Sequence, residues 1–302
     1  MKNLLSVSDL NKKQILELIN LANKIKKNPL QYNTKLKNKN IILLFQKPST
    51  RTRVSFEVGV NQLGGNAIVL NWNELQLGRG ETVEDTTRVF ERYADMIVAR
   101  VFLHNDLIKM SKISKIPVVN ALSDLEHPCQ ILSDLFTIYE HFHNFNNLKL
   151  AYIGDGNNVC NSLILGCAIT GINISVATPK DYEPNQTIVK KANKIAKSKI
   201  ILTNDVNGAV KNANILYTDV WVSMHQENEK KERLKIFRKY QINKKLLQNA
   251  NKNAVVMHCL PAHRGLEITN DVMDSKQNII FEQAENRLHL QKALMLKLLN
   301  KI

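Results

Sequence analysis

The sequence predicts an α/β protein with two similar domains, each a parallel sheet flanked by helices. Short apolar runs, which have the length of buried strands, alternate along the chain with longer segments of helical periodicity. The connections between these segments are short, which is typical of parallel sheets covered by helices. The chain of 302 residues is also long enough for two domains with separate cores.

A polar, asparagine-rich stretch at 143–147 interrupts the alternation near the middle of the chain. Polar stretches of this kind commonly connect domains. We therefore expect a first domain over residues 1–143, a second over 144–281 and a closing helix within 282–302.

Apolar spacing and capping signals place the elements of the first half. An amphipathic helix is expected to start near Ser8 and to end before Pro29. Further helices are expected over 54–63, 82–93, 107–113 and 128–142. Strands are expected over 41–45, 67–70, 96–99 and 118–119.

The second half repeats the alternation of strands and helices. Strands are expected over 148–153, 174–177, 200–203, 215–217 and 254–257. Helices are expected between the strands, beginning with 158–169, and a closing amphipathic helix over 282–299. Ligand sites in such folds lie at the carboxyl ends of the strands. Because most of the polar motifs follow strands, we expect them to converge on one cleft between the two halves.

The net charge of +15 raises nucleic acids and acidic membrane surfaces as partners. The lysines are spread widely, however, and often stand beside asparagines, with no basic stripe or aromatic-rich RNA-binding signature. A compositional preference for Lys, Asn and Ile accounts for the charge, so we expect no nucleic-acid partner. A nucleic-acid-binding module would instead lose affinity steeply with salt.

No apolar stretch has the length of a membrane span, because the longest, 163–177, is interrupted by glycines, Thr170 and Asn173. The chain turns polar after Leu4 and Leu5, so we expect no signal peptide and no membrane association. The four cysteines are few and scattered, which is typical of a reducing compartment. The predicted localisation is therefore the cytoplasm.

The segment Ser49–Arg53 (Ser-Thr-Arg-Thr-Arg) follows the predicted strand over 41–45 and lies at the N-terminus of the next predicted helix. Free N–H groups and the positive dipole end of a helix N-terminus favour an anion. Three hydroxyls and two guanidiniums add donors that match phosphate oxygens. An ordinary N-cap needs only one hydroxyl, so we expect an oxyanion site here.

Three polar residues lie at later strand ends. Arg100 ends an apolar strand, where an unpaired buried charge would be costly. It is either a ligand for an anion or carbonyl group or one member of an ion pair with Asp95 or Asp124. His127 and Gln130 share the first turn of a helix, so both can face one small ligand, although a histidine there can also be a simple cap or surface residue.

Histidines and cysteines near these strand ends have a spacing that matches no common zinc site. The set comprises His127, Cys129, His258, Cys259 and His263. Adjacent strand residues point to opposite faces, so we expect no metal and interpret Cys129 as a packing residue. Cys259 lies at a strand end near several cationic groups, which predicts a lowered thiol pKa; the alternative is a small buried hydrophobe.

Two loops of the second half also follow strands. The segment 154–158 (Gly-Asp-Gly-Asn-Asn) begins like a dinucleotide-binding loop but lacks the third glycine, so we expect no nucleotide cofactor. The segment Asp219–Met224 (Asp-Val-Trp-Val-Ser-Met) offers the carboxylate of Asp219 and the hydroxyl of Ser223, which together suit a ligand ammonium group.

Five motifs resemble those of the aspartate and ornithine carbamoyltransferases, in order over nearly the whole chain. They are Ser-Thr-Arg-Thr-Arg at 49–53, His-Pro-Cys-Gln at 127–130, Gly-Asp-Gly-Asn-Asn at 154–158, Asp-Val-Trp-Val-Ser-Met at 219–224 and His-Cys-Leu-Pro at 258–261. The last two resemble the ornithine enzymes rather than the aspartate enzymes. The resemblance implies transfer of the carbamoyl group of carbamoyl phosphate to the δ-amine of L-ornithine, giving L-citrulline and phosphate in arginine metabolism, without cofactor or metal.

The resemblance further implies a carbamoyl-phosphate domain, then an ornithine domain, a last helix that packs back on the first domain, and assembly as a trimer or a multiple of trimers. By position, the carbamoyl-phosphate site would comprise Ser49, Thr50, Arg51, Thr52, Gln76, Arg100, His127, Gln130, Cys259, Leu260 and Arg287. The ornithine site would comprise Asn158, Asp219, Ser223 and Met224. Arg100, His127 and Cys259 would be catalytic, and Gln76 would reach the site of a neighbouring subunit.

A few residues bear on which amine the enzyme uses. Putrescine and an acetylated ornithine are alternative substrates for the same scaffold. Asp219 and Ser223 favour ornithine, because they suit a free α-amino group that both alternatives lack. His225 stands where the family usually has glycine; it either slows this loop or points into solvent without effect.

The anion-loop interpretation predicts that Arg51→Ala nearly abolishes activity, because water cannot replace a bidentate phosphate contact at equal strength. Steady-state kinetics and equilibrium binding of carbamoyl phosphate measure the effect. Retained affinity for carbamoyl phosphate in this variant would contradict the assignment.

Overall fold

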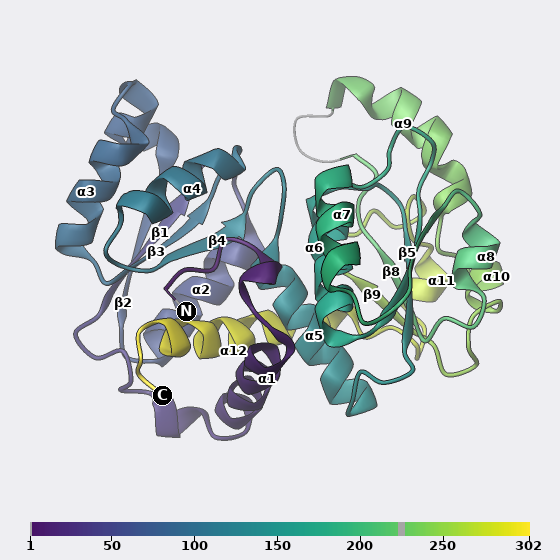
Figure 1. Cartoon of the computed structure of the whole chain (residues 1–302), viewed down its shortest axis with the longest axis horizontal. Coiled ribbons are helices and arrows are strands. Elements are labelled where there is room, and N and C mark those ends of the chain that lie inside the picture. Colours follow the sequence, from purple (N-terminus) through teal and green to yellow (C-terminus); the bar gives the residue numbers. More distant parts are fainter. Residues whose placement is uncertain (1, 223–226) are drawn as a thin grey trace. The chain divides into compact units, whose positions relative to one another are not determined.

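The computed structural model describes residues 2–222 and 227–302 and divides into two compact units (Figure 1). The first unit contains the chain up to Thr137 together with Glu285–Ile302, and the second contains Ile138–Ala284. Both changes of unit fall inside helices, α5 (Pro128–Phe142) and α12 (Ile280–Leu298). The polar stretch at 143–147 directly follows α5.

The first unit is built on a four-stranded parallel sheet with the order β2-β1-β3-β4. Its strands are β1 (Asn40–Phe45), β2 (Asn66–Asn71), β3 (Met96–Arg100) and β4 (Val118–Leu122). The two central strands are almost entirely buried, as the continuous apolar runs of parallel strands require. Leu107 and Met110 pack against this sheet from a neighbouring helix.

The helices of this unit that precede α5 are α1 (Lys12–Lys27), α2 (Thr50–Gln62), α3 (Val83–Tyr93) and α4 (His104–Ile113). The predicted start of α1 near Ser8 is wrong. Ser6 caps only a short 3-10 turn, and Leu10 returns to extended backbone. A second capping box, at Asn11 and Gln14, then starts α1. The region therefore contains two successive helix starts, where the sequence predicted a single one.

The second unit holds a five-stranded parallel sheet with the order β7-β6-β5-β8-β9. Its strands are β5 (Lys149–Ile153), β6 (Asn173–Ala177), β7 (Ile200–Thr203), β8 (Ile215–Thr218) and β9 (Val255–His258). The prediction of two parallel sheets is confirmed. The strand order reverses at β5, between β6 and β8, and ligands of open parallel sheets bind beside such a reversal.

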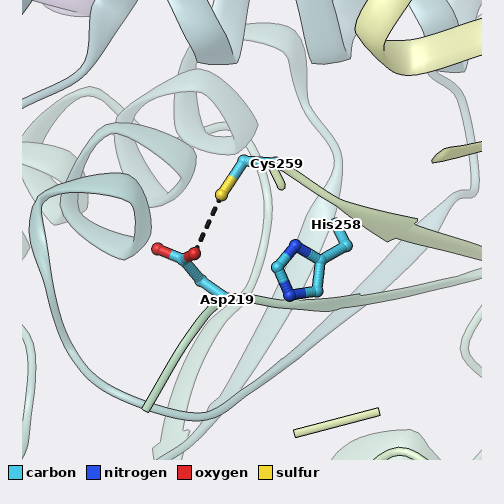
Figure 2. Close-up of side chains that lie close together, drawn as sticks. All are labelled: Asp219, His258 and Cys259. Atoms are coloured by element: carbon cyan, nitrogen blue, oxygen red, sulfur yellow. Dashed lines mark hydrogen bonds between the residues drawn. The ribbon is translucent and has the colours of Figure 1, made fainter. Parts of the chain in front are cut away.

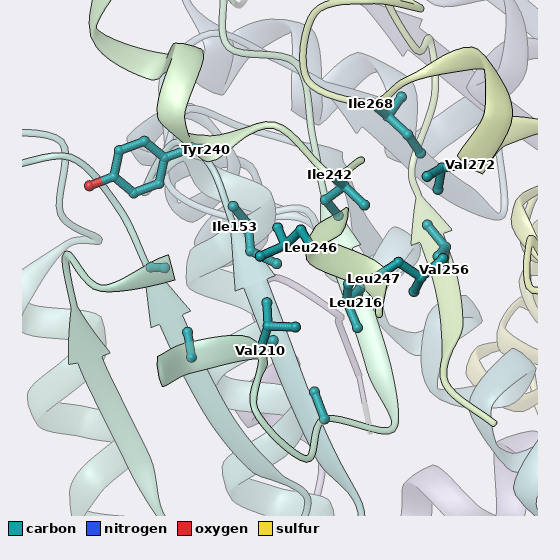
Figure 3. Close-up of a cluster of buried hydrophobic side chains, with 14 of the residues drawn as sticks. Ile153, Val210, Leu216, Tyr240, Ile242, Leu246, Leu247, Val256, Ile268 and Val272 are labelled. Atoms are coloured by element: carbon teal, nitrogen blue, oxygen red, sulfur yellow. The ribbon is translucent and has the colours of Figure 1, made fainter. Parts of the chain in front are cut away.

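Helices cover both faces of this sheet. They are α6 (Asn158–Thr170), α7 (Gln186–Ile195), α8 (Val206–Val210), α9 (Lys230–Phe237), α10 (Lys244–Leu247) and α11 (Asn270–Met273). Helix α6 is almost wholly buried and lies beside α7. On another face, Leu216 and Val256 of the sheet pack with Val210 of α8 and Leu246 of α10 (Figure 3). Among the described residues no helix is long and apolar enough to cross a membrane.

Helix α12 packs back on the first unit, as predicted. Lys292 donates from Nζ to Oε1 of Gln62 in α2 at 2.8 Å, and its Cγ would lie 3.3 Å from a Cβ added at Gly59. Asn286 donates to Thr137 Oγ1 at 3.0 Å. Glycine at position 59 therefore allows close approach of the two helices, which ties the end of the chain to the unit that carries the expected phosphate loop.

Candidate active site

The first turn of α2 forms the candidate anion site of the first unit. Ser49 is its N-cap residue in extended backbone, and its Oγ accepts a hydrogen bond from the Thr52 N–H at 3.2 Å. No acidic residue lies in this turn, so the positive end of the helix dipole is not neutralised within it. Arg53 pairs along the helix with Glu57, Nε to Oε2 3.3 Å. The amide groups and hydroxyls of the predicted anion site thus lie together in this turn.

Arg287 of α12 reaches this turn from the far end of the sequence. Its Nη2 donates to Oγ1 of the fully buried Thr52 at 3.0 Å. Arg287 is itself buried, whereas Arg51 is half-buried and Thr50 is exposed. A buried guanidinium beside a helix N-terminus matches the geometry of a phosphate oxygen pair.

Arg100 at the end of β3 and His127 and Gln130 at the start of α5 are all buried. Gln130 donates from Nε2 to Asp134 Oδ1 at 2.8 Å. Burial, then the charges of Arg287 and Arg100, hold the pKa of His127 well below its usual range. The imidazole is therefore neutral at neutral pH and offers one N–H donor. The first unit thus gathers two arginines and a neutral histidine.

The two carboxylates considered as ion-pair partners of Arg100 each have another polar contact. Asp95 Oδ1 lies 2.5 Å from Lys39 Nζ, and Asp124 Oδ1 accepts a hydrogen bond from the His104 N–H at 2.8 Å.

Lys47 is a candidate site residue that the sequence analysis did not select. Its Nζ lies 4.7 Å from the centroid of the Phe102 ring. Burial, then the charge of Arg100, lowers the pKa of Lys47. A lysine two residues before Ser49 was the available signal, but it could not be told from an ordinary surface lysine.

Asn157 ends the loop between β5 and α6 in the second unit, and Asn158 is the first residue of α6. Asn157 caps α6 through Oδ1, which accepts hydrogen bonds from Val159 and Cys160 N–H groups at 3.0 and 3.1 Å. Its Nδ2 donates to Asp219 Oδ2 at 2.7 Å. Sequence reasoning selected Asn158, the first residue of α6, and missed the capping role of its neighbour.

Asp219 is a buried carboxylate between the ends of β8 and β9. Its Oδ1 accepts the Val220 N–H at 2.8 Å and lies 3.0 Å from the Cys259 sulfur, as Figure 2 shows. The expectation of cationic surroundings for Cys259 is not met by this contact, because its thiol donates to a carboxylate. Leu260 follows with a positive φ of 59°. The predicted residues Asp219, Cys259 and Leu260 therefore lie together.

Asp219, His258 and Cys259 each offer one potential metal ligand within 4.8 Å of the others. Both ring nitrogens of His258 are engaged, however. Nδ1 accepts the Leu260 N–H at 2.8 Å, and Nε2 lies 3.1 Å from Glu267 Oε1. The ring therefore has no lone pair left for a cation.

Cys129 likewise does not fit a metal site. Burial raises the pKa of its thiol to about 12, and Sγ donates to the Asn120 carbonyl oxygen at 3.3 Å. A metal ligand must be a thiolate, whereas this residue remains a packed thiol. The predicted residues Ser223 and Met224, and also His225, lie outside the described residues.

Arg233 of α9, which sequence reasoning missed, links two of these loops. Its buried guanidinium pairs with Asp155 after β5, and its Nε donates to the Trp221 carbonyl oxygen after β8 at 2.7 Å. Its guanidinium carbon lies 4.8 and 5.1 Å from the ring centroids of Tyr182 and Phe237, which contact each other edge to face. Burial raises the pKa of Asp155 to about 6, although the charge of Arg233 acts in the opposite direction.

This pKa predicts a pH dependence of stability. Between pH 3.8, the pKa of Asp155 in the unfolded chain, and about pH 6, its pKa in the folded protein, the folded protein holds this proton and the unfolded chain does not. The group therefore stabilises the fold most at low pH, and that contribution, about 3 kcal/mol, is lost as the pH rises through 6. Asp155→Asn should remove this component from the free energy of unfolding, measured with urea from pH 4 to 7. Asp205→Asn, an exposed control, should keep the wild-type slope; an unchanged slope in Asp155→Asn would refute the assignment.

Comparison with known proteins gives the same family over both units. Residues 2–140 match the model of the carbamoyl-P binding domain of aspartate/ornithine carbamoyltransferase, and residues 146–298 match that of its Asp/Orn binding domain.

Relatives match over the full length. An ornithine carbamoyltransferase of Archaeoglobus fulgidus is 52% identical, over 100% of this chain and 98% of the relative. A catabolic ornithine carbamoyltransferase of Thermoplasma volcanium is 51% identical, over 99% of each chain. The solved structure of ornithine carbamoyltransferase from Pyrococcus furiosus is 45% identical with a TM-score of 0.95, over 100% of this chain and 98% of that one. The chain therefore belongs to the aspartate/ornithine carbamoyltransferase family.

Proposed function

We propose that this protein is an ornithine carbamoyltransferase, which transfers the carbamoyl group of carbamoyl phosphate to the δ-amine of L-ornithine and releases L-citrulline and phosphate. The observation that carries the proposal is the gathering of Arg100, His127 and Arg287, three buried side chains of the first unit. Relatives named for this activity, about half identical over the whole chain, support the same substrate pair.

The phosphate end of carbamoyl phosphate binds at the first turn of α2. Ser49, Thr50 and Thr52 offer hydroxyls and amides, and Arg51 and Arg287 offer guanidiniums. Charge-assisted contacts of this kind are the strongest hydrogen bonds available to a protein. Because the turn has no carboxylate of its own, the anion meets no like charge within it.

The carbamoyl oxygen binds to Arg100 and His127, with Gln130 beside them. When the amine lone pair attacks the carbamoyl carbon, negative charge develops on that oxygen. Each well-aimed donor stabilises such an oxyanion by roughly 3 kcal/mol. His127, whose lowered pKa favours the neutral imidazole, offers its one N–H to that oxygen. Collapse of the intermediate then breaks the C–O bond, and phosphate leaves with the electron pair and takes up the proton that the attacking nitrogen loses.

The amino-acid end of ornithine binds to the second unit. The carboxylate of Asp219 binds the α-ammonium group of ornithine. Asn158, the first residue of α6, also contributes to the ornithine site. Ser223 and Met224 complete this set by their family positions. Cys259 and Leu260 border the reacting amine; the thiol already shares the carboxylate of Asp219. Putrescine and an acetylated ornithine have no free α-amino group to bind the buried carboxylate of Asp219. This carboxylate therefore favours ornithine.

Citrulline formation with ornithine, putrescine and acetylated ornithine side by side tests the activity. We expect turnover with ornithine alone, and none with the other two amines. Activity with putrescine only, or binding to nucleic acid that carbamoyl phosphate does not affect, would contradict the proposal.

Asp219→Asn tests the ornithine site. It should raise the ornithine KM at least about tenfold, since a charge-assisted contact is lost, and leave carbamoyl-phosphate affinity near wild type. Asp205→Asn makes the same chemical change at an exposed position after β7 and should leave both constants unchanged. Equal loss of both affinities in Asp219→Asn would point to a folding role.

We further propose a cytoplasmic homotrimer, or a multiple of trimers, that acts in arginine metabolism. Gln76 supports a shared site, because it is exposed in a 3-10 turn, Gln76–Arg79, within its own chain. The relative from Thermoplasma volcanium is named catabolic, so the biosynthetic direction is part of the proposal and is tested by the rates of the forward and reverse reactions.

The shared site predicts complementation between inactive chains. Gln76→Ala should lower activity without changing the mass measured by light scattering. When Gln76→Ala and Arg51→Ala chains are refolded together, some sites then carry neither change, so part of the activity returns. A fully active monomer, or no recovery in mixed oligomers that light scattering and mass spectrometry show to have formed, would refute sharing.

A further inference from the structure

Leu260 has an unusual backbone conformation for its residue type. The described residues other than glycine with positive φ are Asn38, His143, Asn147, Asp181, Asn212, Leu260 and Asn300. All but Leu260 are types whose polar side chains tolerate the left-handed region. Such a conformation persists only where neighbouring contacts hold it, and it is concentrated at functional sites.

The contact that holds Leu260 is a hydrogen bond from its N–H to Nδ1 of His258 at 2.8 Å. Because a backbone N–H can only donate, Nδ1 carries no proton. The ring proton is therefore on Nε2, which donates to Oε1 of Glu267 at 3.1 Å. Both side chains of this pair are buried. The carboxylate thus selects the tautomer of His258 that can accept from Leu260.

Glu267 also contacts the other end of the same turn. Its Oε1 accepts the backbone N–H of His263 at 2.5 Å. One buried oxygen therefore receives hydrogen bonds from both ends of the segment 258–263, which contains Cys259 and Leu260. The His263 ring approaches the other oxygen, Nδ1 to Oε2 3.8 Å, but its side chain is half-exposed.

The end of strand β9 is anchored separately from Glu267. The backbone N–H of His258 donates to Gln283 Oε1 at 2.9 Å, and Gln283 Nε2 donates to the Tyr217 hydroxyl at 3.2 Å. The strand is also paired with β8. Loss of the Glu267 contacts should therefore release the turn and leave the strand in place.

We propose that Glu267 is a positioning residue for the amine end of the reaction. Acting through His258, it holds Leu260 in its left-handed conformation and keeps the Cys259 thiol against Asp219, where Figure 2 shows the ring of His258 beside these two residues. This inference rests on the proposed function of Cys259 and Leu260 as the border of the reacting amine. In this proposal, the buried pair of Glu267 and His258 fixes the positions of Cys259 and Leu260.

Two substitutions separate the hydrogen-bonding role from simple packing. Glu267→Gln keeps an oxygen that accepts from His258 and His263, so kcat/KM for ornithine should stay within about threefold of wild type. Glu267→Leu keeps the volume but no acceptor. It should lower kcat/KM for ornithine by roughly 10 to 100-fold, since small misplacements near the reacting atoms have effects of this size.

Thr170→Val is the matched control for lost stability. It removes a buried hydrogen bond of the same unit, from Thr170 Oγ1 to the Gly166 carbonyl oxygen at 2.7 Å, remote from the turn in sequence. It should lower Tm while leaving the ornithine constants unchanged. Wild-type ornithine constants in a folded Glu267→Leu protein would overturn the proposal, and so would an equal loss in Thr170→Val at matched Tm.

The tautomer of His258 provides a readout that does not depend on activity. Nitrogen-15 spectra of histidine-labelled protein, assigned with His258→Asn, should show a protonated Nε2 in wild type and in Glu267→Gln, and a mixture in Glu267→Leu. A protonated Nδ1 in wild type would overturn the proposal. If wild type forms no citrulline, the proposed function fails while this spectrum still tests the network.

Discussion

The organisation of the second unit depends on one buried carboxylate. Asp219 is surrounded by an amide from Asn157, its neighbour's backbone N–H and the thiol of Cys259. A carboxylate removed from water must be matched by donors. These donors come from loops at the ends of β5, β8 and β9, which the strand order brings side by side. The parallel topology therefore gathers, at one edge, groups that lie up to about a hundred residues apart.

The first unit presents the opposite electrostatic situation. Arg100 and Arg287 are buried near enough for both to act on His127, and Arg100 acts on Lys47 as well. Like charges crowded in a poorly solvated region repel one another. An anionic ligand relieves that repulsion when it binds, whereas a neutral ligand cannot. Burial first, and then this crowding, lowers the pKa of His127, and the same crowding favours a phosphate-bearing substrate.

The regular elements could be predicted because their signals are local. Proline at position 128, followed by apolar residues, gives α5 its correct limits, and Ser49 marks α2. Motif residues such as Asp219 and Cys259 were found because they follow strands. Arg233 and Glu267 were not, because their meaning lies in partners elsewhere in the chain: Arg233 pairs with a carboxylate 78 residues away. Spacing along a sequence carries no trace of such a pairing.

The division of the chain between the units has a consequence for biosynthesis. The first unit includes Glu285–Ile302, whereas the second is a continuous segment. On the ribosome, the second unit can complete its sheet while the first still lacks α12, including the partners of Gln62, Thr137 and Thr52. The first turn of α2 therefore acquires Arg287 only when α12 has been translated, after the whole sheet of the second unit. A nascent chain stalled before that point holds an unfinished anion site, so premature binding of the substrate is limited by the order of synthesis itself.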